Sequence, residues 1–424
     1  MLGKIVEYFL EICKIPHCSK DADRLFEFLV DFAKSKGYAV QTDSAKNILI
    51  SKGSPRLCLQ AHYDMVCVGK APDIHPFLRE DNFLIAKESS LGADNGIAIA
   101  MMMVLMDSGE ELEFLITSDE EIGLIGASAL EFELSSSYML NLDSEEQGEV
   151  YIGCAGGADI KAIYSDELVD GVGKCYEVSV LKLQGGHSGV DINKNIPSAI
   201  KVLASYLASH KLDVVSMYAG ERINSIPANA VAIVRSLQEL TSSDKVQVRE
   251  LTEEPKVLKN SDRFIKMLDG FVHGVIEFDE KLAIPYSSAN LALVNSNEDG
   301  TFDIECSLRA MDMDVLSHIT DEYKLYLQNY GCKVEVTDKY PAWKPEVNEF
   351  TDIVFDKLKK HFKEPKLKAI HAGLECGVIS QKYPHIKFAS IGPTIRYPHS
   401  TREELDIDSV RRTFEVLQDV IDSF

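Results

Sequence analysis

The sequence places acidic residues directly behind short apolar segments. The stretch FLITSDEEIGLIGA, residues 114–127, carries Asp119, Glu120 and Glu121 after an apolar run. Neighbouring carboxylates in a confined space raise one another's pKa, so ionising all three is costly unless a positive charge lies close by. A bound divalent metal ion is the strongest such charge in proteins. The triplet therefore indicates either a solvated acidic loop or one part of a metal site.

Four other segments deliver ligand-type residues in the same way. LCLQA is followed by His62 and Asp64, SLGADNG carries Asp94, YMLNL is followed by Asp143, and the loop after KFASIGP leads to His399. Open α/β sheets place their ligand sites at the carboxyl ends of the strands, so we expect these side chains to meet at one edge. Two imidazoles with several carboxylates suit Zn²⁺, and also Mn²⁺ or Co²⁺.

The spacing within two segments suggests roles for single residues. An acid two positions after His62, here Asp64, can accept the second ring N–H of a metal-binding histidine. One of Glu120 and Glu121 would bind metal, and the other would act as a base toward the attacking water. Taken singly, each residue has an ordinary explanation: Asp94 as a helix N-cap, the acidic segments as solvated loops, and the histidines as surface residues. Their occurrence together at one sheet edge favours the metal site.

The elements that must position these residues alternate between helix and strand. We expect helices at 21–36 and 97–106, and strands at 47–51, 57–61, 112–117 and 138–142. Helices that separate short apolar strands are typical of a mostly parallel sheet covered by helices on both faces. The first part of the chain is therefore predicted to be an α/β domain.

The pattern changes at about residue 157. Longer, alternating strands are separated by predicted helices at 197–210, 262–271 and 315–330. The order strand–helix–strand–strand, repeated in mirror form, predicts a ferredoxin-like α+β domain. After YPAWKP the chain returns to an apolar strand and a closing amphipathic helix at 407–424. We predict a catalytic domain built from residues 1–156 and 344–424, with a lid or dimerisation domain of residues 157–343 inserted into it.

The composition indicates which classes of binding partner and which cellular compartment to expect for this protein. The 424 residues carry a net charge of −23 and no Lys/Arg-rich run, which argues against nucleic acid or an anionic membrane as the main partner. The N-terminus predicts an amphipathic helix rather than a signal peptide, and no apolar run approaches the length of about 18 residues that a membrane span needs. Nine scattered cysteines without a C-x-x-C pair predict buried thiols of a reducing cytoplasm, with no disulfide framework.

Several blocks of the sequence closely resemble the aminoacyl-histidine dipeptidases, also called Xaa-His or cytosol non-specific dipeptidases. These enzymes belong to the di-zinc exopeptidase superfamily, which includes carboxypeptidase G, aminoacylase and carnosinase. The resemblance runs from the first helix to the last and keeps the order of the motifs. The blocks are AHYDMV, LGADNGIAIA, TSDEEIGLIGA, NLDSEEQGEVYIGCAGG, GGHSGVDI, HAGLECGVI and GPTIRYPHSTREEL.

The resemblance implies two divalent metal ions per chain, Zn²⁺ first, with Co²⁺ or Mn²⁺ as alternatives. It assigns His62 and Asp143 to one metal, Glu121 and His399 to the other, and Asp94 to both. It also implies that Glu120 is the general base, that Asp64 supports the ring of His62, and that the peptide bond between Asp94 and Asn95 is cis.

The resemblance further assigns residues outside the predicted metal centre. His187, in the GGHSGVDI block, matches a histidine that reaches the catalytic centre from the second domain, often across a homodimer. Asn224 and Arg309 match positions associated with the C-terminal carboxylate of the substrate, and Gly373 and Glu375 border the substrate site. Without the resemblance, His187 would be an exposed turn histidine and Arg309 a solvated arginine on a strand.

Three functions are compatible with these features. The leading one is a cytoplasmic metallo-dipeptidase that cleaves unblocked dipeptides, with Xaa-His dipeptides as one candidate preference. The second is another amidohydrolase of the superfamily, such as an N-acyl amino acid deacylase. The third, a non-catalytic binding protein on the same scaffold, is disfavoured because all five ligand positions and Glu120 are intact. GGHSGV lacks the G-x-S-x-G spacing of a serine hydrolase, and IGCAGG lacks that of a dinucleotide site.

Overall fold

The computed structural model describes residues 1–424, which form two compact units. The terminal unit comprises Met1–Cys154, Pro345–Ala369 and Leu374–Phe424, and the inserted unit comprises Ala155–Lys344 and Ile370–Gly373. The main boundaries lie close to those expected from the sequence. The short segment 370–373 differs, because it packs with the inserted unit although the predicted division places it in the catalytic domain.

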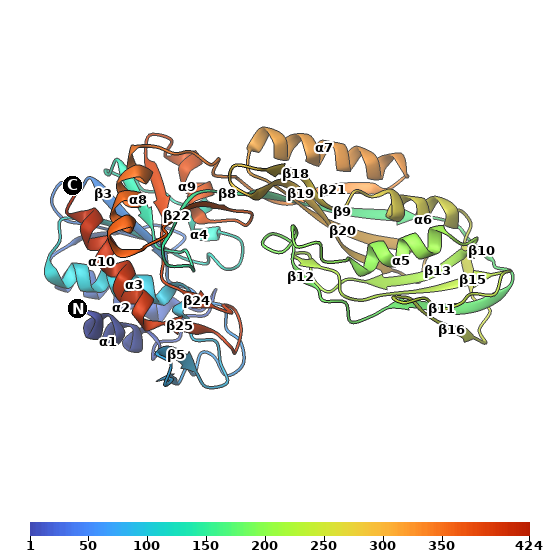
Figure 1. Cartoon of the computed structure of the whole chain (residues 1–424), viewed down its shortest axis with the longest axis horizontal. Coiled ribbons are helices and arrows are strands. Elements are labelled where there is room, and N and C mark those ends of the chain that lie inside the picture. Colours follow the sequence, from blue (N-terminus) through green and yellow to red (C-terminus); the bar gives the residue numbers. More distant parts are fainter. The chain divides into compact units, whose positions relative to one another are not determined.

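The terminal unit contains helices and short strands from both ends of the chain (Figure 1). Its elements are α1 (Leu2–Ile12), α2 (Asp23–Ser35), β1 (Ala39–Thr42), β2 (Ile48–Ser51), β3 (Leu57–His62), β4 (Pro76–Leu78), β5 (Phe83–Ala86), α3 (Ala93–Ser108), β6 (Glu113–Thr117), α4 (Ile125–Ser128), β7 (Tyr138–Asn141), β8 (Glu149–Cys154), α8 (Glu349–His361), β22 (Lys366–Ile370), α9 (Glu375–Lys382), β23 (Lys387–Ser390), β24 (Ile395–Arg396), β25 (Glu404–Asp406) and α10 (Ile407–Ile421).

The central sheet of this unit has the strand order β1-β2-β6-β3-β7-β23-β8-β22. Strands β6, β3, β7 and β23 are parallel to one another, whereas β1, β2 and β8 pair antiparallel. The predicted α/β class is confirmed, but the sheet is mixed rather than mostly parallel. Every residue of β3 and β6 is buried, as expected for central strands with both faces covered. His62 lies opposite Thr117, so the two strands end at the same edge.

Helix α3 packs its whole apolar surface inside the terminal unit. Residues Ala93 to Met106 are all buried, which explains why the helix shows no polar face. Gly92 precedes it with φ of +71°, a left-handed conformation that favours glycine, and a Cβ atom there would lie 2.8 Å from the sulfur of Met65. The predicted cis peptide between Asp94 and Asn95 is present. No helix of the chain combines the length and the apolarity of a membrane span.

A second, smaller sheet with the order β24-β25-β5-β4 was not predicted from the sequence. Its strands have two to four residues, too few for an apolar alternation to stand out. β24 and β25 are antiparallel, and the loop that joins them carries His399. The pairing of β25 with β5 fixes one end of this loop to the first part of the chain.

The inserted unit is built on one antiparallel sheet of nine strands, β16-β11-β15-β13-β19-β20-β9-β21 with β18 beside β19. Side chains on one face of this sheet form a single core with helices α5, α6 and α7, and α7 lies along β9, β20 and β21 (Figure 1). The expected order of strands and helices is present, but the sheet is larger than that of a simple ferredoxin-like domain.

The bounds of the inserted unit's elements are β9 (Gly156–Ser165), β10 (Leu168–Asp170), β11 (Lys174–Val180), β12 (Gly186–His187), α5 (Ala199–Ala208), β13 (Asp213–Ala219), β14 (Ser225–Ile226), β15 (Ala230–Ser236), β16 (Gln247–Leu251), β17 (Lys256–Leu258), α6 (Ser261–Gly270), β18 (Gly274–Asp279), β19 (Ile284–Ser296), β20 (Thr301–Ala310), α7 (Met313–Asn329) and β21 (Lys333–Tyr340).

One cysteine pair contradicts the expectation that all nine thiols are free. Cys18 and Cys67 form a disulfide, with their Cα atoms 5.5 Å apart. The segment around Cys18 pairs with the chain beyond β3, because Ser19 donates its N–H to Met65 O and Met65 donates to His17 O. This pairing is long-range and leaves no spacing motif, so the sequence did not reveal it. The remaining seven cysteines are buried, as predicted.

Candidate metal centre

The structure brings all five predicted metal ligands together at the carboxyl edge of the central sheet. His62 ends β3, Glu121 follows β6, Asp143 follows β7, Asp94 is the second residue of α3, and His399 lies between β24 and β25. The ligand-type atoms form groups within 4.8 Å of one another, one with His62, Asp94 and Asp143 and another with Asp94, Glu121 and His399. Segments that are far apart in the sequence therefore converge on one point.

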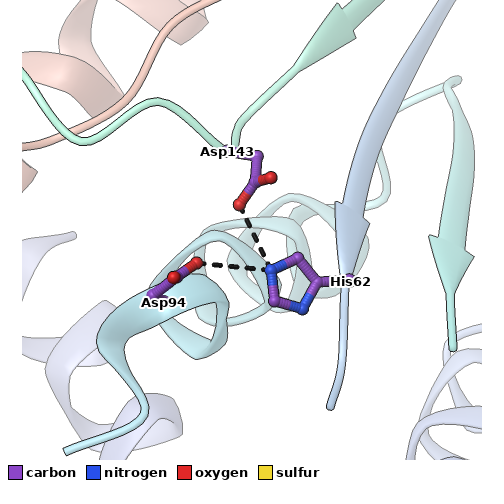
Figure 2. Close-up of side chains that lie close together, drawn as sticks. All are labelled: His62, Asp94 and Asp143. Carbon is purple, nitrogen blue, oxygen red and sulfur yellow. Dashed lines mark hydrogen bonds and ion pairs between the residues drawn. The ribbon is translucent and has the colours of Figure 1, made fainter. Parts of the chain in front are cut away.

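Asp94 stands between the two histidines. His62 Nε2 lies 3.3 Å from Asp94 Oδ1 and 3.3 Å from Asp143 Oδ1, and Figure 2 shows the ring directed between these two carboxylates. His399 Nε2 lies 3.0 Å from the other oxygen, Asp94 Oδ2, and 2.9 Å from Glu121 Oε1. Each oxygen of Asp94 thus faces a different histidine. This is the arrangement expected of a carboxylate that bridges two metal ions.

Asp64, the residue predicted to support the ring of His62, contacts that ring mainly through its backbone. His62 Nδ1 donates to the carbonyl oxygen of Asp64 at 3.0 Å, while the Asp64 carboxylate lies 3.6 Å away. With Nδ1 donating to this carbonyl, Nε2 is the ring nitrogen that faces Asp94 and Asp143 and the one that would bind a metal after losing its proton.

The carboxylate of Asp64 binds the turn that carries Glu120 and Glu121. It accepts hydrogen bonds from Ser19 Oγ at 2.8 Å, from Glu120 N at 2.9 Å and from Glu121 N at 3.4 Å. Asp64 is itself buried. The positions of the predicted base and of one predicted ligand therefore both depend on this side chain. Gly126 makes the turn possible, because a Cβ atom there would lie 2.3 Å from Ser118 O.

The electrostatics of the cluster fit a bound cation. Burial raises the pKa of Asp143 to about 6 and that of Glu120 well above its ordinary value, and burial also raises the pKa of Glu121. Burial alone would raise the pKa of Asp94 too, but hydrogen bonds from the two histidines hold it low. Burial alone would lower the pKa of His399, yet the carboxylates of Asp94 and Glu121 raise it to about 11.

Four carboxylates in this cluster face only two imidazoles. With all four (Asp94, Glu120, Glu121 and Asp143) ionised and both rings protonated, the group would keep an excess of negative charge in a poorly solvated place, and burial opposes that ionisation by raising the pKa of three of them. Glu121 Oε1, although close to His399, is buried and accepts no well-formed hydrogen bond. A divalent cation would neutralise these oxygens, and nitrogen and carboxylate donors are the set that Zn²⁺, Co²⁺ or Mn²⁺ accept. The residues present therefore fit the implied metals.

Glu375, predicted at the border of the substrate site, is completely buried at the start of α9. Its carboxylate accepts hydrogen bonds from Gln60 Nε2 at 2.5 Å and from Thr117 Oγ1 at 2.7 Å, and burial raises its pKa to about 7. Gln60 also accepts from Asn141. Sequence reasoning gave Gln60 and Asn141 no role, although polar residues within apolar strands were an available signal.

His187 lies in a tight loop of the inserted unit, at the end of the short strand β12. Its backbone N–H donates to Asp191 Oδ2 at 2.8 Å, and its ring Nδ1 accepts from Gly189 N at 3.1 Å and from Val190 N at 3.3 Å. Ser188 N donates to the carbonyl oxygen of Asn224, so these two predicted residues belong to neighbouring segments. A neutral ring that accepts at Nδ1 carries its proton on Nε2, and is therefore a donor there.

Arg309 is not a solvated strand arginine, because only 8% of it is exposed. Its Nη1 donates to Tyr340 Oη at 2.5 Å, while its Nε is buried without a hydrogen-bond partner. Gly373 lies against the same tyrosine, where a Cβ atom would be 3.0 Å from the ring. Beside Arg309 in the sheet, Ser288 forms a hydrogen bond with His371 Nε2 at 2.7 Å.

Comparison with known proteins agrees with this geometry. The model of peptidase family M20/M25/M40 matches residues 58–423. The chain is 32% identical to the cytosol non-specific dipeptidase of Escherichia coli (strain K12), over 98% of this chain and 96% of that protein. The crystal structure of aminoacylhistidine dipeptidase from Vibrio alginolyticus superposes with a TM-score of 0.85 at 28% identity, covering 99% of this chain and 96% of that one. Human carnosine dipeptidase 1 shares the fold, with a TM-score of 0.55 at 13% identity.

The histidine and carboxylate cluster, in a chain that matches a peptidase family, defines the class as metal-dependent hydrolases. Within that class, the chain belongs to peptidase family M20/M25/M40. It is a metallopeptidase, a hydrolase that acts on peptide bonds. The family resemblance and the enzyme class predicted from the sequence are confirmed.

Proposed function

We propose that this chain is a di-metal dipeptidase that hydrolyses the peptide bond of unblocked dipeptides. The observation that carries the metal centre is the position of Asp94, whose two oxygens face His62 and His399 separately. The similarity to a curated dipeptidase extends over almost the whole of both chains, which supports the substrate class. His62 and Asp143 hold one metal, Glu121 and His399 hold the other, and Asp94 binds both.

The residues of the chain divide the work of hydrolysis. Two bound divalent ions supply Lewis acidity for water and for the scissile carbonyl. Glu120 takes a proton from the attacking water and passes it to the leaving amine. Burial raises the pKa of Glu120 above its ordinary value. Asp64 keeps this carboxylate in place through the backbone N–H of Glu120.

Removal of the metals is expected to abolish activity. We assign Zn²⁺ as the first candidate, with Co²⁺ or Mn²⁺ as alternatives, because two imidazoles with carboxylates suit all three ions. Protein treated with a chelator should lose turnover, and adding back one of these ions should restore it, with close to two ions per chain by elemental analysis. Full turnover in protein shown to contain no metal would contradict the proposed centre.

The substrate preference is expected to follow the free ends of the dipeptide. Arg309 and Asn224 bind the C-terminal carboxylate in this proposal, and Gly373 and Glu375 border the substrate site. Xaa-His dipeptides should therefore be cleaved faster than amidated dipeptides, which lack that charge, and other free dipeptides test the breadth of the preference. A panel that includes N-acyl amino acids decides between the two enzyme classes. Faster hydrolysis of the acyl amino acids would identify a deacylase instead.

The inserted unit serves in this proposal as a lid and as a dimerisation domain. Strand β18 pairs only with β19, so its other edge is open, and Ile276 and Phe278 on it are 36% and 43% exposed. An open edge with exposed apolar side chains is a common site for pairing with another chain. We assign this edge to a homodimer, in which His187 acts on the substrate from the same or the partner chain.

We place the protein in the cytoplasm. The curated relative is named as a cytosolic enzyme, and seven buried cysteines outside the disulfide suit a reducing compartment. The disulfide between Cys18 and Cys67, in contrast, is unusual for a reducing compartment. If it is reduced there, the backbone hydrogen bonds between Ser19 and Met65 and between Met65 and His17 still hold the segment against the chain that follows β3.

A further inference from the structure

A single buried carboxylate accepts a row of backbone N–H groups next to the metal centre. Glu403, only 3% exposed, accepts from Leu91 N at 2.7 Å and Gly92 N at 3.1 Å through Oε2, and from Ala93 N at 2.8 Å and Asp94 N at 3.3 Å through Oε1. Both oxygens are thus used twice. The sequence pattern does not predict a role for this residue.

The four donors belong to the turn that begins α3. The first N–H groups of a helix have no partner within the helix, and they form its positive end. No side chain at the N-cap position of α3 accepts them. Glu403 supplies that acceptor from more than 300 positions further along the chain. Because one of its hydrogen bonds is to the N–H of Asp94 itself, the carboxylate holds the backbone of the residue whose oxygens face both histidines.

The backbone of Glu403 belongs to the loop that carries His399. It lies four positions after His399, and its own N–H donates to Ser400 O at 3.2 Å. The next residue, Glu404, begins β25, which pairs with both β24 and β5. Glu403 therefore connects the loop that carries His399 with the turn that carries Asp94, and both of these side chains face the second metal position.

We propose that Glu403 is a positioning residue that sets the spacing between Asp94 and His399 and thereby the affinity of the second metal. The inference rests on the proposed metal centre. It adds a determinant that touches neither metal nor substrate and acts through the backbone. Groups that orient metal ligands in this way typically contribute about 10–100-fold in metal affinity or activity.

The test compares three variants with the wild-type protein. Glu403→Gln replaces one oxygen by an NH₂ group, which would face two N–H donors and remove half of the hydrogen bonds. Glu403→Asp keeps the charge and both oxygens but shortens the side chain by one CH₂ group. Because the charge is kept, this variant should fold more readily than Glu403→Gln and retain part of the positioning effect. Glu404→Gln is the matched control, because it removes a neighbouring carboxylate that pairs with Arg79 and not with the start of α3.

Metal-free protein is titrated with Co²⁺, and binding is followed by absorption and by elemental analysis. Glu403→Gln is expected to weaken one of the two sites by about 10–100-fold and to change the Co²⁺ spectrum, with kcat reduced and KM nearly unchanged. Glu403→Asp should lie between Glu403→Gln and the wild type. Glu404→Gln should match the wild type.

A purely structural role predicts a different outcome. Folded Glu403→Gln, or folded Glu403→Asp if the first variant does not fold, would then bind Co²⁺ with wild-type affinity and spectrum, and the inference would be wrong. Asp94→Ala in the same titration separates this result from a failure of the proposed centre. If Asp94→Ala also kept both ions at wild-type affinity, the bridging role of Asp94 itself would be wrong.

Discussion

Replacing Glu120 by glutamine is expected to lower turnover by about 10²–10⁴-fold or more while metal content stays at the wild-type level. Glutamine keeps the size and the backbone hydrogen bond to Asp64, which uses the N–H of residue 120 and not its side chain. It cannot accept a proton from water near neutral pH. The loss should therefore appear in kcat, with little change in substrate binding.

Two comparison variants make the Glu120 experiment specific. Asp119→Asn removes a carboxylate from the same triplet, but this side chain accepts from Lys20 N and belongs to no ligand group, so turnover should stay near normal. Asp94→Ala removes the residue that faces both histidines and should lower metal content and turnover together. Near-normal turnover in Glu120→Gln would show that another group takes the proton.

The candidate site could be predicted from the sequence because its residues stand at the ends of strongly apolar segments. A buried strand such as β3 or β6 can be recognised in the sequence by its apolar run. The first polar residues beyond it must then lie at the sheet edge. Parallel pairing then brings several such ends together. His62 and Asp143 could be placed at one edge for this reason, without knowledge of any contact between them.

What the sequence did not reveal depends on pairings without a local pattern. The hairpin of β24 and β25 has too few residues for a periodicity, and the antiparallel outer strands of the central sheet look the same in sequence as parallel ones. The contact of Glu403 with the start of α3, the disulfide of Cys18 and Cys67, and the return of 370–373 to the inserted unit are equally non-local. Each is decided by the assembled fold.

The same contrast holds for the details of chemistry. The motif predicted that Asp64 would support His62, yet the backbone carbonyl makes that contact and the carboxylate holds the turn of Glu120. Residue type and spacing therefore identified the right residue with an incomplete role. The choice between two acceptors of one residue depends on rotamers and on neighbours such as Ser19, which lie elsewhere in the chain.

Replacing His187 by alanine is expected to reduce kcat by about 10²–10³-fold, the scale of one lost oxyanion donor, with metal content unchanged. The ring is fixed in a form suited to donation, because Nδ1 accepts from the N–H groups of Gly189 and Val190 and the proton is left on Nε2. His318→Ala, an exposed histidine of α7, is the matched control and should leave kcat unchanged. Steady-state kinetics and elemental analysis on both variants provide the measurement.

The partner-chain version of this role has a sharper test. In a homodimer in which His187 acts on the other subunit, the inactive variants His187→Ala and Glu120→Gln should regain part of the activity when mixed. One site of each mixed dimer would then combine an intact Glu120 with an intact His187. Sedimentation of the mixture establishes that dimers are present. If dimers form and mixing restores nothing, His187 acts within its own chain. Normal kcat in His187→Ala alone would remove the role altogether, because a residue needed to stabilise the oxyanion cannot be lost without slowing the chemical step.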